Sequence, residues 1–311
     1  MRAVRIHRFG PPAVLVLDDI PQPVPGPGEV LVRVAATGVG PWDALIREGK
    51  SKVSPAPPLT LGSDLSGVIV ALGADVADFK TDDEVYGVTN QQFCGANAEF
   101  AIASASMIAK KPKRLSHLEA ASAPVIAVTA WQMLFDYARV TEKQRVLILG
   151  AGGNVGAYAV QLAAMTGLNI TAVAGSNDIE YVRSLGADSI LDYRSGSFEE
   201  LLGPVDAVID TVGGETRERS FRVVKPGGIV VSVVSTDPIQ QRPGVRSVFF
   251  YVEVTTARLN TISKMFDDGV LLPRVGSVLP LDGARTAHEM LAGAPHLRGK
   301  IMLDTTLPAD K

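Results

Sequence analysis

Short aliphatic segments alternate with helical segments along the middle of the chain, from Arg145 to about Val234. The strand-like segments are RVLIL, NITAVA, SIL, AVID and GIVVSVV. Helical spacing of apolar residues predicts helices near 155–165, 178–185, 197–202 and 215–224. This alternation is typical of an α/β fold with a parallel, doubly wound sheet, whose ligand lies outside the carboxyl ends of the strands. The segment SVFFYV at 247–252 predicts a sixth strand, either covered within the chain or paired at its edge with a second copy.

The two flanking regions have a different pattern. From Met1 to about Leu115, short strands are interrupted by Pro and Gly, and polar and apolar residues alternate within them. This pattern predicts a β-rich, antiparallel, barrel-like domain. The tail, from about Leu271 to Leu303, returns to short strands around one helix, so we expect it to complete the first domain. The predicted domains are therefore 1–118 together with 270–311, and 119–269.

A helix is predicted to begin just after the first β-rich region. Ser116 is followed three residues later by Glu119, which is the spacing of a capping box, and an Ala-rich stretch comes next.

A glycine-rich turn joins the first strand of the middle region to its first helix, within Val146–Ala163. Glycines recur every third residue, which permits a tight reversal, close approach of a pyrophosphate, and close packing of helix on strand. The amides at the start of the helix attract anions. The candidate cofactor-binding residues in this turn are Gly150, Gly152, Gly153, Asn154, Val155 and Gly156. An ordinary strand-to-helix turn is the alternative interpretation.

Composition narrows the class of protein. The chain has 311 residues, 46% of them apolar, and a net charge of −3, which argues against a nucleic-acid partner because such proteins carry large basic patches. No apolar run is long enough to span a bilayer, and the start of the chain does not have the pattern of a signal peptide, so we expect no membrane partner. The single cysteine, Cys94, fits a reducing cytoplasm.

Several motifs occur in an order that resembles the medium-chain dehydrogenase/reductase superfamily, and within it the zinc-independent, quinone oxidoreductase-like branch. They are FGPPAVL, PGPGEVLVRVAATGV, LGSD at 61–64, DEVYG at 83–87, the glycine turn, RSLGAD at 183–188, DTVGG at 210–214, KPGG at 225–228 and RGKIML at 298–303. The resemblance covers nearly the whole chain. It implies a GroES-like catalytic domain, a Rossmann domain, and transfer of a hydride from a reduced nicotinamide cofactor to an activated acceptor.

The resemblance also bears on metal binding. Gly40 and Ser63 stand where zinc-dependent members carry a cysteine and a histidine, and one cysteine cannot build a four-cysteine structural site. The four histidines show no ligand spacing. We therefore expect no zinc. A quinone or enone is the expected acceptor, because hydride delivery to a conjugated system places charge on a distant oxygen that hydrogen-bond donors can stabilise.

The choice between NADPH and NADH depends on the end of the second strand. NAD sites usually place a carboxylate there, whereas this chain has Ala174, Gly175, Ser176 and Asn177, followed by Asp178. The resemblance implies that NADPH is bound by Ser176, Asn177, Tyr193 and Arg194, although the basic residue frequent in the family's turn is missing. We predict NADPH, with NADH as the alternative. A helix-capping role is the other interpretation of Ser176 and Asn177.

Four more residues match cofactor-binding positions of the family. Thr129 corresponds to a threonine on the nicotinamide side, Val212 and Gly213 to the loop under the ribose, and Lys300 to a position near the bound cofactor. A threonine inside a helix and an exposed lysine are the alternatives for Thr129 and Lys300.

The acceptor end departs from the family pattern. Many members carry Asn before Pro-x-Asp and a tyrosine two residues later, whereas this chain has Gly40 before Pro-Trp-Asp and Leu45 at the tyrosine position. Trp42 is expected to stack on a flat acceptor or to pack in the core. Asp43 is a pocket candidate or a helix cap. These four residues are the candidates for the acceptor pocket, and no catalytic acid or base is assigned.

The leading hypothesis is a cytoplasmic, NADPH-dependent reductase of quinones or enones that forms a homodimer. The alternative is a nucleotide-binding protein of the same fold with little catalysis, acting as a redox sensor or associated with RNA. The acceptor itself depends on loops near 42–60, 88–97 and 235–255, whose shape the sequence does not predict.

Overall fold

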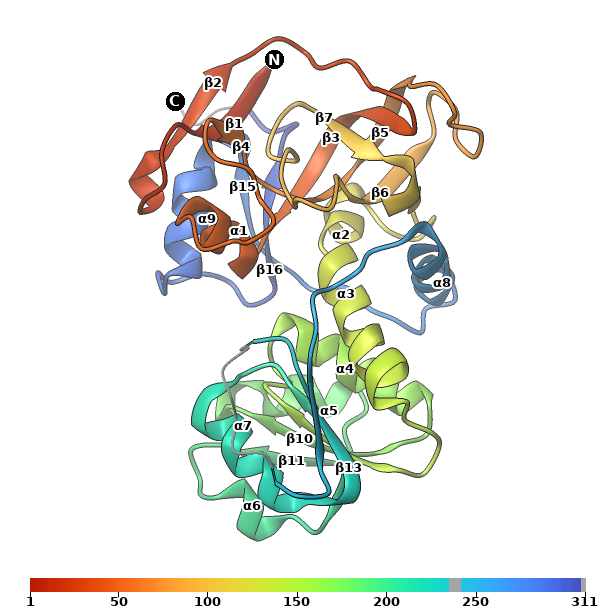
Figure 1. Cartoon of the computed structure of the whole chain (residues 1–311), viewed down its shortest axis with the longest axis vertical. Helices are drawn as coiled ribbons and strands as arrows, with labels where there is room; N and C mark the ends of the chain where they lie inside the picture. The colour runs from red at the N-terminus through yellow and green to blue at the C-terminus, as the bar shows by residue number, and fades with distance from the viewer. Residues whose placement is uncertain (235–241, 309–311) are drawn as a thin grey trace. The chain divides into compact units, whose positions relative to one another are not determined.

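The chain divides into two compact units in a computed structural model that describes residues 1–234 and 242–308. Unit 1 comprises Met1–Val125 and Val254–Lys311, and unit 2 comprises Ile126–Glu253 (Figure 1). The sequence placed these junctions after residues 118 and 269 instead. Part of the loop expected near 235–255, residues 235–241, lies outside the described residues.

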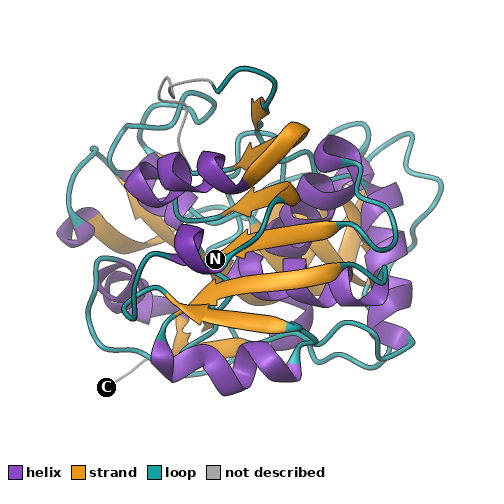
Figure 2. Cartoon of the chain, turned by 90° about the horizontal axis from the view of Figure 1, so that it is seen from below, coloured by secondary structure: helices purple, strands orange, loops and turns teal. Residues whose placement is uncertain are grey.

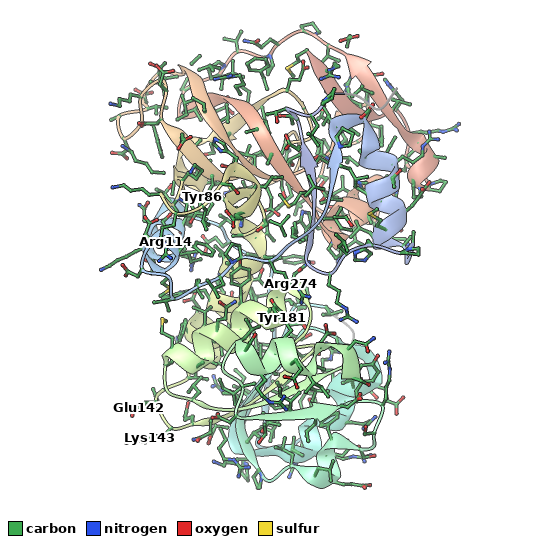
Figure 3. All side chains as sticks on the ribbon, turned by 180° about the vertical axis from the view of Figure 1, so that it is seen from behind. Tyr86, Arg114, Glu142, Lys143, Tyr181 and Arg274 are labelled. Carbon is green, nitrogen blue, oxygen red and sulfur yellow. The ribbon has the colours of Figure 1, made fainter. Side chains whose placement is uncertain are left out.

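Helix α8 (Thr256–Asp267) accounts for the shift of the second junction, because it is bonded to unit 1. The buried Tyr86 hydroxyl donates to the Leu259 carbonyl over 2.7 Å, and the Thr256 hydroxyl donates to the Ile108 carbonyl, also over 2.7 Å. Tyr86 is labelled in Figure 3. The helix therefore belongs with the β-rich unit and not with the parallel sheet.

Two sheets build unit 1. The larger has the order β15-β16-β3-β5-β6-β8, with β7 also paired to β3, and all its pairings are antiparallel except β15 with β16. The smaller has the order β2-β1-β4. The strands are β1 (Arg2–Ile6), β2 (Leu15–Asp19), β3 (Glu29–Val39), β4 (Leu59–Thr60), β5 (Asp64–Leu72), β6 (Glu84–Val88), β7 (Phe100–Ser104), β8 (Ile108–Lys110), β15 (Val275–Pro280) and β16 (Lys300–Asp304).

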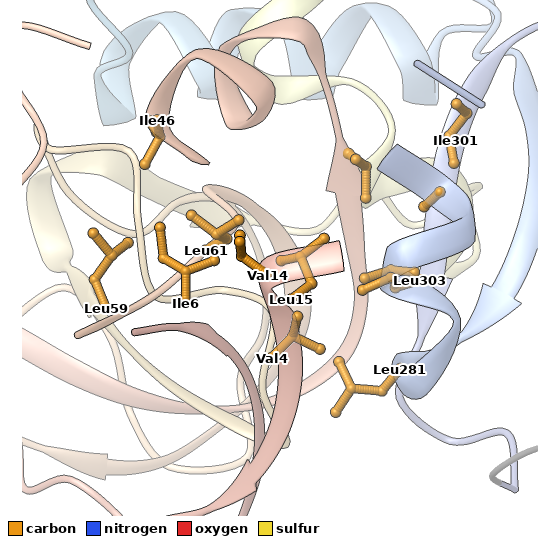
Figure 4. Close-up of a cluster of buried hydrophobic side chains, with 13 residues drawn as sticks. Val4, Ile6, Val14, Leu15, Ile46, Leu59, Leu61, Leu281, Ile301 and Leu303 are labelled. Atoms are coloured by element: carbon orange, nitrogen blue, oxygen red, sulfur yellow. The ribbon is translucent and has the colours of Figure 1, made fainter. Parts of the chain in front are cut away.

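The tail completes the larger sheet, because β16 pairs with β3 so that Ile301 lies opposite Val39. Helix α9 (Ala284–Leu291) precedes this strand, and α1 (Pro41–Arg47) follows β3. Figure 4 shows the apolar cluster that joins the two ends of the chain in this unit. Its buried members include Val4, Ile6, Leu15, Ile46, Leu59, Leu61, Leu281, Ile301 and Leu303.

Unit 2 contains a six-stranded parallel sheet in the order β11-β10-β9-β12-β13-β14. Its strands are β9 (Arg145–Leu149), β10 (Asn169–Ala174), β11 (Ser189–Asp192), β12 (Val205–Asp210), β13 (Val224–Ser232) and β14 (Arg246–Phe249). β9 and β10 have the predicted bounds. β14 is the predicted sixth strand, and it lies at the end of the sheet. The strand order reverses between β9 and β12, which is where a doubly wound sheet binds its ligand.

Helices lie on both sides of these strands (Figure 2). They are α4 (Asn154–Met165), α5 (Ile179–Ser184), α6 (Phe198–Leu201) and α7 (Gly214–Ser220).

Helix α2 (His117–Ala121) begins with the predicted capping box, since the Glu119 carboxylate accepts from the Ser116 amide over 2.8 Å and the Ser116 hydroxyl accepts from the Glu119 amide over 3.3 Å. Helix α3 (Pro124–Trp131) continues as a π-helix over Gln132–Ala138. Within the described residues, no helix is both long enough and apolar enough to cross a membrane.

Candidate functional site

The glycine turn after β9 leaves no room for larger residues at two positions. Gly150 has a φ of +76°, and a Cβ there would lie 2.5 Å from the Thr211 hydroxyl. A Cβ on Gly156 would lie 2.2 Å from the Gly150 carbonyl oxygen, far inside the contact distance. The turn therefore needs glycine at its start, for the left-handed backbone, and at 156, so that α4 can pack against it.

Helix α4 begins at this turn with no side-chain cap. Gly153 is the N-cap residue, and Asn154 and Val155 open the helix with half-buried side chains. The first amides of a helix lack partners within the helix, and the helix dipole adds positive charge at this end. No side-chain cap bonds these amides, an arrangement that suits an anion.

Asp210 holds the loop after β12 in shape, and Thr211 ties this loop to the end of β9. The buried Asp210 carboxylate accepts from the amides of Val212 and Gly213 over 3.0 and 2.9 Å, and from the Ser232 hydroxyl over 2.6 Å. The Thr211 hydroxyl donates to the Leu149 carbonyl over 2.7 Å. The sequence predicts a role for Val212 and Gly213 but none for Asp210. An acidic residue at the end of an apolar strand was the one feature of the sequence that could have indicated the role of Asp210.

The carboxyl ends of β10 and β11 bring together three of the predicted cofactor residues. The Ser176 hydroxyl donates to the Asp192 carboxylate over 2.5 Å, and this bond is the main cause that lowers the pKa of Asp192. The Tyr193 ring lies against Gly175, where a Cβ would be 3.3 Å from it, and the Arg194 guanidinium lies 5.1 Å from the centre of that ring. Sequence reasoning found no carboxylate in the turn after β10, but β11 supplies one from the neighbouring strand.

Neither Ser176 nor Asn177 caps a helix. The N-cap of α5 is Asp178, and the short 3-10 turn before it, Ser176–Asp178, begins after Gly175. The capping interpretation of these two residues is therefore wrong. The Asp178 carboxylate lies against the glycine turn, since a Cβ on Gly152 would be 2.7 Å from its Cγ.

Lys300 lies in unit 1 and is not the exposed lysine of the alternative interpretation. Its side chain is 1% exposed, and its ammonium donates over 2.8 Å to Asp64, which is fully buried. The Asp64 carboxylate also accepts from the Val125 amide over 3.0 Å. Burial raises the pKa of Asp64, and the Lys300 charge opposes this rise. The Lys300 ammonium also lies 4.0 Å from the centre of the Trp42 ring, within the range of a cation–π contact.

The Trp42 indole occupies the space that a side chain at position 40 would enter. A Cβ on Gly40 would lie 2.5 Å from the indole ring, and the indole N–H donates to the Ser63 hydroxyl over 3.0 Å. The sequence indicates only that Gly40 lacks the polar side chain of the family. It does not indicate that the Trp42 ring fills the space which that side chain would occupy. The short spacing of the two residues in the chain was the only signal.

Asp43 and Leu45 lie in different surroundings. Asp43 is fully buried, and its carboxylate accepts from the Gly40 amide over 2.8 Å at the start of α1, which is the capping role expected as an alternative. Burial raises the pKa of Asp43 to about 7. Leu45 is 47% exposed. Thr129 is buried within α3.

No group of three or more His, Cys, Asp or Glu side chains that could hold a metal is found in residues 1–234 and 242–308. Gly40 has no side chain to offer, and the Ser63 hydroxyl accepts from the Trp42 indole. His288 is buried, and its Nδ1 lies 2.7 Å from the Arg47 guanidinium. The donor set at these positions does not suit zinc.

Comparisons with known proteins agree with the two-unit architecture. An alcohol dehydrogenase GroES-like domain model matches residues 26–113, and a zinc-binding dehydrogenase model matches residues 185–303. A structure of the quinone oxidoreductase from Coxiella burnetii superposes with a TM-score of 0.91 at 32% identity, and covers 98% of this chain and 99% of that one. These matches confirm the predicted fold class, a GroES-like β-rich domain with a doubly wound Rossmann domain.

The chain is also similar in sequence to known oxidoreductases. The quinone oxidoreductase of Mus musculus is 31% identical over 97% of this chain and 97% of its own length. The NAD(P)H oxidoreductase RTN4IP1, mitochondrial, of Homo sapiens is 40% identical over 61% of this chain. That alignment covers 53% of the human protein, so the chain matches about half the length of this relative.

Proposed function

The chain belongs to the medium-chain dehydrogenase/reductase superfamily, and on this premise we propose that it is an NAD(P)H-dependent oxidoreductase. Its proposed reaction is transfer of a hydride from NADPH to a quinone or an α,β-unsaturated carbonyl, without zinc. The observation that carries this proposal is the glycine turn, where a Cβ on Gly156 would strike the Gly150 carbonyl and where α4 begins without a side-chain cap.

The glycine turn suits the pyrophosphate of a dinucleotide. Its compact backbone permits close approach, and the uncapped amides of α4 donate hydrogen bonds to an anion. A bound reduced nicotinamide cofactor would supply the hydride. Asp210 holds the amides of Val212 and Gly213 in place, so it fixes the loop proposed to lie under the ribose.

NADPH is the proposed donor, with NADH as the alternative. Ser176, Tyr193 and Arg194 gather at the carboxyl end of β10, where the adenosine ribose of a dinucleotide is expected in this fold. Arg194 supplies the only positive charge among these three side chains. Asn177 is exposed on the same turn and adds an amide.

A flat conjugated acceptor suits the side chains of unit 1. Trp42 is held at its N–H by Ser63 and at its ring by the Lys300 ammonium, so its orientation is fixed. An oriented aromatic ring favours stacking on a planar quinone or enone. Because Gly40 and Ser63 offer no cysteine or histidine ligand, the acceptor is one whose own conjugation accommodates the charge. We assign no catalytic acid or base and propose solvent as the source of the final proton.

The test is steady-state oxidation of NADPH and of NADH with a panel of quinones and a panel of enones. We expect acceptor-dependent oxidation, unchanged after treatment with a chelator, and no stoichiometric zinc by elemental analysis. Dinucleotide binding without turnover on either panel would instead support the nucleotide-binding protein with little catalysis. If the chelator abolished acceptor-dependent oxidation and added zinc restored it, the metal-free proposal would be contradicted.

We also propose a homodimer located in the cytoplasm. β14 lies at the end of the unit 2 sheet and leaves an edge that a second copy could extend. Sedimentation equilibrium checks the oligomeric state, and a monomer at micromolar concentration would contradict it. Fractionation of cells that express the full-length protein checks the location.

A further inference from the structure

The carboxyl ends of β10 and β11 carry a negative charge that the proposed NADPH site does not require. Ala174, the last residue of β10, pairs with Asp192, the last residue of β11, so the two strands end at the same level of the sheet. Asp192 is half-buried, and both its carboxylate oxygens accept hydrogen bonds, one from the Ser176 hydroxyl and one from the Arg194 amide over 2.9 Å. The carboxylate is therefore anchored to the turn that follows β10.

This turn is where a doubly wound sheet distinguishes the two dinucleotides. The ribose of the adenosine half lies at the carboxyl end of the second strand, where its 2′ group is either a hydroxyl or a phosphate. A carboxylate accepts a hydrogen bond from a 2′-hydroxyl, but it repels a 2′-phosphate. In this chain the second strand of the sheet is β10, and Asp192 lies one hydrogen bond from its turn.

The same bond also changes what Ser176 can offer. Its hydroxyl has one proton, which it donates to Asp192. The remaining lone pairs can only accept, so Ser176 in this arrangement does not donate to a phosphate. Among Ser176, Tyr193 and Arg194, only Arg194 carries a positive charge, and its guanidinium lies beside the exposed ring of Tyr193.

We propose that Asp192 is a specificity-determining residue that weakens binding of the 2′-phosphorylated dinucleotide and allows NADH to compete with NADPH. This inference rests on the proposed function, because it assumes that unit 2 binds a dinucleotide at the glycine turn. Asp192 and Arg194 act in opposite directions: the carboxylate lowers the preference for a 2′-phosphate, and the guanidinium raises it.

The test is Asp192→Asn in the full chain. Asparagine has the same shape without the charge: its one oxygen can accept from the Arg194 amide, and its NH2 group can donate to the Ser176 hydroxyl oxygen. Dissociation constants are measured by calorimetry for NADPH and NADH, and for the fragments adenosine 2′,5′-bisphosphate and adenosine 5′-monophosphate. We expect the ratio of dissociation constants, NADH to NADPH and unphosphorylated to 2′-phosphorylated fragment, to rise about fivefold to tenfold in the variant. A change of this size is expected when one charge near a phosphate is removed in water-like surroundings.

Salt and two further variants separate this effect from a structural one. At about 0.5 M salt the gain should shrink, because screening weakens interactions between exposed charges. Arg194→Gln should change the ratio in the opposite direction. The matched control is Glu142→Gln, which removes one charge from the exposed loop before β9 and should leave the ratio unchanged. Glu142 is labelled with its ion-pair partner Lys143 in Figure 3.

The outcomes are distinguishable. If Asp192→Asn leaves the ratio of the two fragments unchanged while both still bind, the inference is wrong and the proposed function stands. An equal gain for both fragments, or a gain that salt does not reduce, also contradicts it. If the unaltered chain binds none of the four ligands, the proposed function fails and the inference fails with it.

Discussion

The buried pair of Lys300 and Asp64 should be one of the most sensitive points of unit 1. The two side chains are 1% and 0% exposed, and their charged atoms lie 2.8 Å apart. Lys300→Met keeps the length of the side chain but leaves the Asp64 carboxylate buried without its counter-ion. Removing one partner of a buried pair costs about 3–5 kcal/mol, so we expect a loss of this size in the free energy of unfolding at pH 8.

The loss should depend on pH in a defined direction. In the variant, burial acts on Asp64 without the opposing Lys300 charge, so its folded pKa rises further above the unfolded value. A carboxyl group whose pKa is raised on folding binds more protons in the folded state, and its folded form loses stability as the pH rises between the two pKa values. The destabilisation should therefore be smaller at pH 5 than at pH 8, by about 1.4 kcal/mol for each pH unit over which folded Asp64 stays protonated.

The assay is urea unfolding followed by tryptophan fluorescence in a Trp131→Phe background, where Trp42 of unit 1 is the only remaining tryptophan. The double variant Lys300→Met with Asp64→Asn should recover at least about 2 kcal/mol relative to the sum of the single changes. The matched control is Lys225→Met, which breaks an ion pair of the same 2.8 Å length whose side chains are 40% and 25% exposed, and should cost about 1 kcal/mol or less. A cost for Lys300→Met no larger than that of the control, with no pH dependence, would refute this reasoning.

Three further predictions concern other residues. Burial lowers the pKa of His288 from 6.5 to about 3, so the folded state resists protonation of this side chain. The free energy of unfolding should therefore fall by about 1.4 kcal/mol per pH unit as the pH decreases from 6.5. His288→Gln should remove this slope in acid unfolding curves. Gly156→Ala should cost about 1–3 kcal/mol by thermal unfolding, and more than Gly153→Ala, because the new Cβ would lie 2.2 Å from a backbone oxygen instead of 3.2 Å; equal costs would contradict this account of the turn. Gly40→Ala should displace the Trp42 ring and shift its fluorescence emission, and an unchanged spectrum would show that the ring does not occupy this space.

Local patterns predicted most of the fold. β9 and β10 have the predicted bounds because each is a short aliphatic run between polar turns, and the capping box at Ser116 depends on two residues only three positions apart. The second domain junction was wrong because α8 is amphipathic and its place is decided by partners elsewhere in the chain, such as the Tyr86 hydroxyl. Helical periodicity shows that a helix exists but does not show which sheet it covers.

The site was predicted less completely, for two physical reasons. Asp192 lies 16 residues after Ser176, and only the register of β11 on β10 brings the two together. The pairing of Lys300 with Asp64 joins residues 236 positions apart. Gly40 and Trp42 are only two residues apart, but the Trp42 ring covers Gly40 because of its side-chain orientation, which residue type alone does not specify.

The discontinuity of unit 1 has a consequence for how the chain is made. Unit 2 is contiguous, from 126 to 253, so all its strands are available before synthesis reaches the last segment. Unit 1 lacks β16, and with it Lys300, until nearly the whole chain has been translated. During that interval the end of β3, from Ala36 to Val39, lacks its β16 partner, and Asp64 has no counter-ion. On the ribosome, the parallel sheet can therefore reach its native pairing first, while the β-rich unit waits for its final strand, and this interval is when the nascent chain is most exposed to misassembly and to chaperones.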